Sequence, residues 1–78
     1  MPNVTIYSTP ACVYCKMAKK FFDQHKVAYE ERDVVTDMQA REEMIAKSGQ
    51  LGVPVIVVGD AVVVGFDKGK LIELLKLR

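Results

Sequence analysis

The chain contains no tryptophan, one histidine and only two cysteines among its 78 residues. Its formal net charge of +1 means that lysine and arginine exceed aspartate and glutamate by only one residue, which argues against nucleic acid or an anionic membrane as a partner. No apolar run approaches the roughly 18 residues that span a bilayer, and the start of the chain lacks the pattern of a signal peptide. We therefore expect a cytoplasmic protein that binds neither membranes nor nucleic acids.

Hydrophobic residues make up 50% of the chain and charged residues 27%, a composition typical of a globular protein. This length predicts one domain that covers residues 1–78 and has a single core. The hydrophobic pattern predicts the element order β-α-β-α-β-β-α. The expected strands and helices cover residues 3–7, 14–25, 27–35, 37–47, 55–58, 61–64 and 68–77.

The connections between these segments predict the sheet. A helix joins the first two strands, so they should be parallel with a right-handed crossover. The last two strands flank the turn Gly59-Asp60 and should form an antiparallel hairpin, with Pro54 ahead of it because proline cannot donate a ladder hydrogen bond. The charged residues 30–33 place the second strand at an edge. We expect an α/β fold, with a four-stranded mixed sheet and three helices on its two faces.

Capping residues set the predicted helix boundaries. Thr36 and Gln39 have the spacing of a capping box at the start of the second helix, where they satisfy free amides. Gly49 suits the left-handed position that ends this helix. Asp67 is expected to cap the third helix.

Spacing also predicts which helical side chains are buried. Lys19 and Lys20 fall between the apolar residues of the first helix and indicate a solvated face. Met17, Met38 and Met44 lie on helical stripes and are interpreted as core filler. The apolar stripe of the first helix, which is expected to face the core, comprises Tyr14, Met17, Ala18, Phe21 and Phe22.

Cys12 and Cys15 form a C-x-x-C pair, which in a reducing compartment is more often catalytic or metal-binding than structural. A zinc site needs two more ligands, and the only histidine, His25, would lie ~15 Å away along the helix. The pair is therefore interpreted as redox-active. A metal cluster shared between two chains remains the alternative.

The spacing places both sulfurs on one side of a helix start, close enough for a disulfide. Cys12 is the expected nucleophile, because the first-turn amides and the helix dipole stabilise a thiolate there. Lys16, four residues on, would add to that stabilisation. Cys15, one turn deeper, would be the resolving thiol. The predicted reaction is thiol–disulfide exchange: Cys12 attacks a disulfide of a partner, and Cys15 then releases the reduced partner.

Four segments together resemble the glutaredoxin family of the thioredoxin superfold, over nearly the whole chain. They are IYSTP at 6–10, CVYC at 12–15, GVPVI at 52–56 and GFD at 65–67. The resemblance implies a thioredoxin-like fold and a dithiol-disulfide oxidoreductase that reduces protein disulfides or glutathione mixed disulfides, with no bound cofactor. It also implies a cis Val53-Pro54 bond that faces Cys12 and leaves the backbone of Val53 free to pair with an extended substrate.

The Gly65-Phe66 pair resembles the glutaredoxin-like redoxins that reduce ribonucleotide reductase and take electrons from thioredoxin reductase. Glutaredoxins commonly have a Gly-Gly-x-Asp-Asp run here, whereas this chain has Val64 and Lys68 at the outer positions, which weakens glutathione recognition. Val13 also stands where glutaredoxins have proline. The binding residues that the resemblance implies are Tyr14, Lys16, Val53, Pro54, Gly65, Phe66 and Asp67.

Three of these residues keep a structural alternative: Tyr14 as core, Phe66 as packing against the hairpin, and Asp67 as a helix cap. The expected partners are a disulfide-containing protein, for which ribonucleotide reductase is one candidate, and either glutathione or thioredoxin reductase as electron donor. We expect a monomer. The alternative function is a glutathione-dependent iron–sulfur or zinc protein, bridged as a dimer through Cys12.

Overall fold

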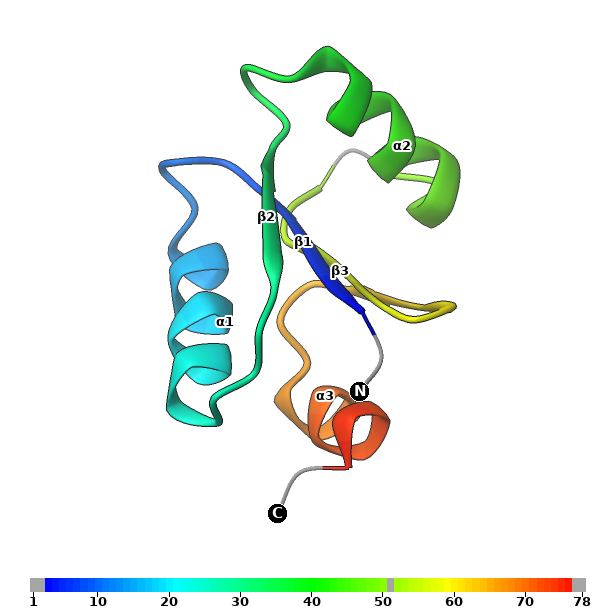
Figure 1. Cartoon of the computed structure of the whole chain (residues 1–78). Coiled ribbons are helices and arrows are strands. Elements are labelled where there is room, and N and C mark those ends of the chain that lie inside the picture. Colours follow the sequence, from blue (N-terminus) through cyan, green and yellow to red (C-terminus); the bar gives the residue numbers. More distant parts are fainter. Residues whose placement is uncertain (1–2, 51, 77–78) are drawn as a thin grey trace.

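The computed structural model describes residues 3–50 and 52–76 (Figure 1). The predicted order β-α-β-α-β-β-α is confirmed. The expected end of the last helix at Leu77 lies outside the described residues. The elements are β1 (Val4–Ser8), α1 (Val13–Gln24), β2 (Glu30–Asp33), α2 (Met38–Ser48), β3 (Val55–Val58), β4 (Ala61–Val64) and α3 (Lys68–Leu75).

The four strands form one mixed sheet in the order β2-β1-β3-β4. β1 and β2 are parallel, whereas β3 is antiparallel to both β1 and β4. The hairpin turns at Gly59, whose φ of 59° is in the left-handed region that glycine adopts without strain. β2 lies at an edge, as its charge predicts, but the ladder covers only Glu30–Asp33 and not the whole of 27–35. Val27 and Val34 flank this ladder and are buried in the core.

Each face of the sheet has its own hydrophobic cluster, and the three helices are divided between them (Figure 1). α1 and α3 cover one face, and α2 covers the other. None of the three described helices has the length and apolar character that a bilayer-crossing helix needs. The first cluster contains Val4, Ile6, Ala18, Phe21, Phe22, Val27, Ile56, Val58, Val63, Leu71 and Leu75. The second contains Tyr7, Val34, Ala40, Met44, Val55 and Val57.

The start of α2 differs from the capping box expected at Thr36 and Gln39. Asp37 is the N-cap, and its Oδ1 accepts a hydrogen bond of 3.2 Å from the amide of Ala40. The helix begins one residue later than expected because a turn occupies the preceding residues, with the amide of Asp37 donating to the carbonyl of Asp33 at 3.0 Å. The end of the helix is as predicted, since Gly49 adopts a left-handed φ of 74°.

Asp37 also pairs with Arg32 at 3.4 Å, and Arg32 pairs with Glu43 at 2.9 Å, so this cap joins β2 to α2. The amide hydrogen bond of Ala40 and the pairing with Arg32 lower the pKa of Asp37, which is therefore a carboxylate at neutral pH.

We expect Asp37→Ala to lower the melting temperature by about 5 °C, the usual effect of losing an N-cap in a domain of this size. Thr36→Ala is the matched control and should change it by less than about 2 °C, because the hydroxyl of Thr36 makes no cap. Thermal unfolding followed by circular dichroism measures both. An equal loss in the two variants would restore Thr36 as part of the cap.

Two methionines differ from the core assignment made by spacing. Met17 is 46% exposed and Met38 is 62% exposed, whereas Met44 is buried as predicted. Met38 is the first residue of α2, and the buried residues of this helix, Ala40 and Met44, lie further along it. In α1 the buried residues are Cys15, Ala18, Phe21 and Phe22. Residue 17 lies about 100° around the helix from Ala18, outside this narrow stripe.

Candidate active site

Cys12 occupies the N-cap position of α1, in the loop that follows β1. Its backbone is extended, with φ −83° and ψ 115°, which turns the sulfur back over the first helical turn. The Sγ of Cys12 accepts a hydrogen bond of 3.1 Å from the amide of Cys15. Both cysteines are free thiols, and Cys12 is partly exposed. The sulfur of Cys12 thus takes the place that a hydroxyl or carboxylate has in an ordinary helix cap.

Cys15 lies in the first turn of α1 and is 0% exposed. Burial raises the pKa of Cys15 to about 12, and the adjacent Cys12 adds to this increase. The backbone of Thr9 and the charge of Lys19 act in the opposite direction. Cys15 is therefore a neutral thiol at neutral pH. The two cysteines have different environments although only two residues separate them.

The sheet brings two distant loops to the same end as the cysteines. β1 and β3 are antiparallel, and Tyr7 is paired with Val55, so the end of β1 lies beside the start of β3. Val55 is also paired with Val64, which places the end of β4 there as well. The three loops that follow or precede these strand ends contain residues 9–12, 52–54 and 65–67. The sheet register therefore assembles the predicted segments.

Val53-Pro54 is a cis peptide, as the family resemblance implies. Pro54 is buried and Val53 is partly exposed. The amide of Gly65 donates to the carbonyl of Pro54 at 2.8 Å, which joins two of the predicted binding segments directly. Gly65 has a φ of 82°, a conformation that favours glycine at this position. Among residues 3–50 and 52–76, none of the backbone–backbone hydrogen bonds in turns, loops and caps involves the amide or the carbonyl of Val53.

Phe66 and Asp67 both have structural contacts. Phe66 is partly buried and packs edge-on against Phe21 of α1, with ring centroids 5.8 Å apart. Its packing partner is thus α1, and not the hairpin alone. The Oδ1 of Asp67 accepts a hydrogen bond of 3.1 Å from the amide of Lys70, so Asp67 caps α3 as predicted.

The remaining predicted residues lie on α1. Tyr14 is 62% exposed, which makes the core assignment wrong and leaves its ring available to a partner. Tyr14 shares a helical face with Ala18 and Phe21, but it lies in the first turn of α1, ahead of the first buried residue of the helix, Cys15. Lys16 is exposed, and its amide donates to the carbonyl of Cys12 at 3.2 Å.

The prediction that Lys19 and Lys20 lie on a solvated face is wrong for Lys19. Lys20 is exposed, but Lys19 is partly buried and its Nζ is 2.7 Å from Oε2 of Glu31 on β2. The same Oε2 accepts a hydrogen bond of 3.1 Å from Oγ of Ser8, which is 1% exposed. Sequence reasoning missed this cluster. Its one signal was the spacing of four between Cys15 and Lys19, which places them on the same helical face.

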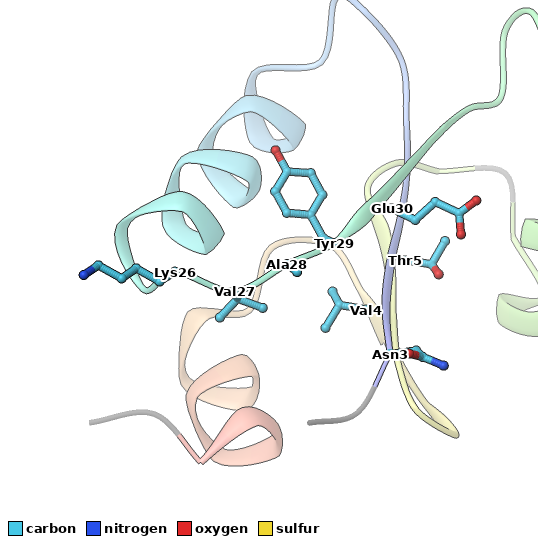
Figure 2. A pocket seen from close by; sticks show the side chains of 8 residues that line it. All are labelled: Asn3, Val4, Thr5, Lys26, Val27, Ala28, Tyr29 and Glu30. Carbon is cyan, nitrogen blue, oxygen red and sulfur yellow. The ribbon is translucent and has the colours of Figure 1, made fainter.

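A cavity of about 640 Å³ lies away from the cysteines (Figure 2). Its walls are residues 3–5, at the start of β1, and residues 26–30, which lead into β2. Cys12 and Cys15 follow the other end of β1, so the cavity and the thiols are separated by the length of that strand. Among the described residues, no group of three or more histidine, cysteine, aspartate or glutamate side chains has the arrangement of a metal site.

A four-stranded mixed sheet between helices, with C-x-x-C at the start of the first helix and a cis proline before the third strand, defines a thioredoxin-like protein. A mutant of the thioredoxin-like protein BC3987 has a TM-score of 0.93 and 35% identity, over 100% of both chains. An uncharacterised glutaredoxin-like 8.6 kDa protein of the rubredoxin operon in Clostridium pasteurianum is 38% identical, over 94% of this chain and 97% of that protein. The glutaredoxin-like protein NrdH of Lactococcus lactis is 34% identical, over 91% of this chain and 97% of that protein.

Residues 4–63 match the glutaredoxin family. The chain belongs to this family, whose members are thiol–disulfide oxidoreductases.

Proposed function

We propose that this protein reduces disulfides of partner proteins, with Cys12 as the nucleophile and Cys15 as the resolving thiol. The observation that carries the proposal is the difference between two thiols in one helical turn. Cys12 is partly exposed and accepts an amide hydrogen bond, whereas Cys15 is fully buried behind it. A partner disulfide therefore has access to the sulfur of Cys12 first.

The proposed reaction has two steps. The thiolate of Cys12 attacks one sulfur of the partner disulfide, and the other partner sulfur leaves with the electron pair. Cys15 then loses its proton to solvent and attacks Sγ of Cys12, which breaks the mixed disulfide and releases the second partner sulfur as a thiolate. The protein ends as a Cys12-Cys15 disulfide, and the partner has gained two electrons and takes up two protons.

Binding is proposed to involve the exposed groups around Cys12. An extended partner segment would pair with the backbone of Val53, in the manner in which a strand adds to a free edge. Tyr14 offers an exposed aromatic ring, and Phe66 offers the part of its ring that Phe21 does not cover. Lys16 and Asp67 add one charge of each sign. Pro54 and Gly65 shape the loop pair that supports Val53.

Thioredoxin reductase is the proposed electron donor, and ribonucleotide reductase is a candidate substrate. Two features support this choice: the Gly65-Phe66 pair, and the similarity to a relative that bears the name NrdH. Val64 and Lys68 stand where glutathione-using relatives have glycine and aspartate, so contacts to the amino-acid end of glutathione would be lost. One lost hydrogen bond to a charged group corresponds to roughly tenfold in binding.

The test is a coupled assay that follows NADPH oxidation with a protein disulfide as substrate. We expect turnover with thioredoxin reductase to exceed turnover with glutathione and glutathione reductase by roughly tenfold. The double variant Val64→Gly, Lys68→Asp restores the Gly-Gly-x-Asp-Asp run and should raise the glutathione-dependent rate. Equal rates with both donors would contradict the donor assignment, and no turnover with either would contradict the oxidoreductase itself.

A further inference from the structure

Ser8, Lys19 and Glu31 form a polar cluster in which Ser8 is buried, Lys19 is partly buried and the side chain of Glu31 is 44% exposed, and no step described so far uses it. Glu31 is its centre: one oxygen, Oε2, accepts hydrogen bonds from Nζ of Lys19 at 2.7 Å and from Oγ of Ser8 at 3.1 Å. Ser8 is held at the end of β1, where its carbonyl accepts from the amide of Val34 at 3.0 Å. Three elements therefore fix the position of one ammonium group.

Cys15 and Lys19 are four residues apart on α1 and share a helical face. The charge of Lys19 lowers the pKa of Cys15, and Cys15 in turn raises the pKa of Lys19. The other titratable groups that act on the pKa of this pair are Cys12 on the active-site loop and Tyr29 and Glu31 on the side of β2, whereas Asp33 acts on Glu31.

Glu31 is not suited to remove the proton of Cys15. The hydrogen bond from Lys19 lowers the pKa of Glu31, and that from Ser8 lowers it further, so Glu31 stays a weakly basic carboxylate. The hydrogen bond to Glu31 raises the pKa of Lys19, so Lys19 keeps its positive charge. The function left for Glu31 and Ser8 is to hold that charge in place.

The charge on Lys19 becomes more important during the second step. In the mixed disulfide the sulfur of Cys12 is bonded to the partner and carries no charge, so its repulsion of a Cys15 thiolate disappears. Burial of Cys15 remains and opposes ionisation. We propose that Lys19, held by Glu31 and Ser8, is a positioning residue that stabilises the thiolate of Cys15 while it attacks Cys12. This inference rests on the proposed function.

The chemistry of that step is balanced without a further reactant. The proton of Cys15 passes to solvent, the new bond joins the two sulfurs of Cys12 and Cys15, and the electron pair of the broken bond leaves on the partner sulfur. Lys19 neither gains nor loses a proton. A merely structural ion pair between α1 and β2 would hold the helix in place but would not change this step selectively.

The experiment is rapid-mixing absorbance spectroscopy with the aromatic disulfide dithiobis(nitrobenzoate), in excess over the reduced protein. The first coloured nitrobenzoate thiolate is released when Cys12 attacks, and the second when Cys15 attacks Cys12. Lys19→Gln should slow the second release about three- to tenfold between pH 6 and 8, and change the first less than about twofold. Lys19→Arg keeps the charge and the carboxylate pairing, and should restore the second release.

Glu31→Gln separates the electrostatic role from the structural one. The amide oxygen of glutamine still accepts hydrogen bonds from Lys19 and Ser8, but the negative charge is gone, so the second release should become faster than in the wild type. Lys20→Gln is the matched control, since it removes an exposed charge from the next position of the helix, and both releases should keep their rates. The inference is wrong if Lys19→Gln leaves the second release unchanged, or if Lys19→Gln and Glu31→Gln shift it in the same direction. Absence of a second release from the wild type would instead refute the assignment of Cys15.

Discussion

Cys12→Ser is expected to reduce the rate of disulfide reduction by at least about 1,000-fold, because a serine hydroxyl stays protonated and is a far weaker nucleophile than a thiolate. The fold should be retained. Serine is a preferred N-cap residue, and its hydroxyl oxygen can accept the amide hydrogen bond that Cys15 now donates to the sulfur of Cys12. Reduction of a protein disulfide by NADPH and a suitable reductase measures the loss, and circular dichroism checks the fold.

Cys15→Ala is the companion variant, because alanine leaves an apolar residue in a site that is fully buried. Its Cys12 still attacks, but nothing resolves the mixed disulfide, so a covalent complex with the partner should accumulate. Mass spectrometry of the quenched reaction detects it. Full activity of Cys12→Ser would overturn the proposed mechanism, whereas full activity of Cys15→Ala would show that one thiol is sufficient.

Phe22→Ala is expected to be the most destabilising substitution in the core. Phe22 is 0% exposed and lies between Phe21 and Tyr29, with ring centroids at 5.8 Å and 5.3 Å. Removing a buried phenyl ring from a packed core costs about 3 to 5 kcal/mol. A small domain has only about 5 to 15 kcal/mol of stability, so the variant should be near the limit of folding. Urea denaturation measures the change in the free energy of unfolding.

Phe22→Leu provides a second measurement if the alanine variant does not fold. Leucine fills most of the volume, so we expect a loss of about 1 to 2 kcal/mol. Val35→Ala is the control on the surface, since Val35 is 62% exposed, and it should change stability by less than about 0.5 kcal/mol. Equal midpoints for Phe22→Leu and Val35→Ala would contradict a core position for Phe22.

Much of the fold was predictable because local signals agreed with the tertiary arrangement. The β-branched runs on either side of Gly59-Asp60 form the hairpin, and the charged edge strand and the caps at Gly49 and Asp67 are confirmed. The start of α2 was predicted wrongly because two adjacent residues can each act as its N-cap. Thr36 and Asp37 are both good caps, and only the turn that Asp33 closes selects Asp37.

The exposed residues of α1 were misassigned for a related reason. Tyr14 and Met17 are apolar at helical spacing, but helical periodicity does not reveal how far the neighbouring elements extend over the helix. In the structure the first buried residue of α1 is Cys15, so Tyr14 precedes the buried part of the helix, and Met17 lies beside the buried stripe. An aromatic ring near the reactive cysteine is thereby left exposed, which agrees with the binding role that the family resemblance implies for Tyr14 and not with its core alternative.

The cysteine pair of the candidate site was predictable from contiguous residues, whereas the distant segments 52–54 and 65–67 were predictable only from the family resemblance. Because the C-x-x-C pair lies at the start of a helix, Cys12 at the N-cap was expected to be the more accessible thiol and Cys15, one turn deeper, the less accessible one. The cluster of Ser8, Lys19 and Glu31 was not predictable, because it depends on the register that pairs Ile6 with Glu31. Register is a long-range property, and three polar residues spread over 24 positions carry no local sign that they share one oxygen atom.

The pairing of Tyr7 with Val55, and of Val55 with Val64, also limits how such a protein evolves. These pairs set the positions of three active-site loops, and a slip of one residue in a strand would move its side chains to the opposite face. An insertion or deletion inside β1, β3 or β4 is therefore expected to displace an active-site loop, whereas a substitution at an exposed loop position such as Gly52 leaves the strand register unchanged. We therefore expect partner preference in such a protein to change by substitution around the reactive centre and not by changes in strand length.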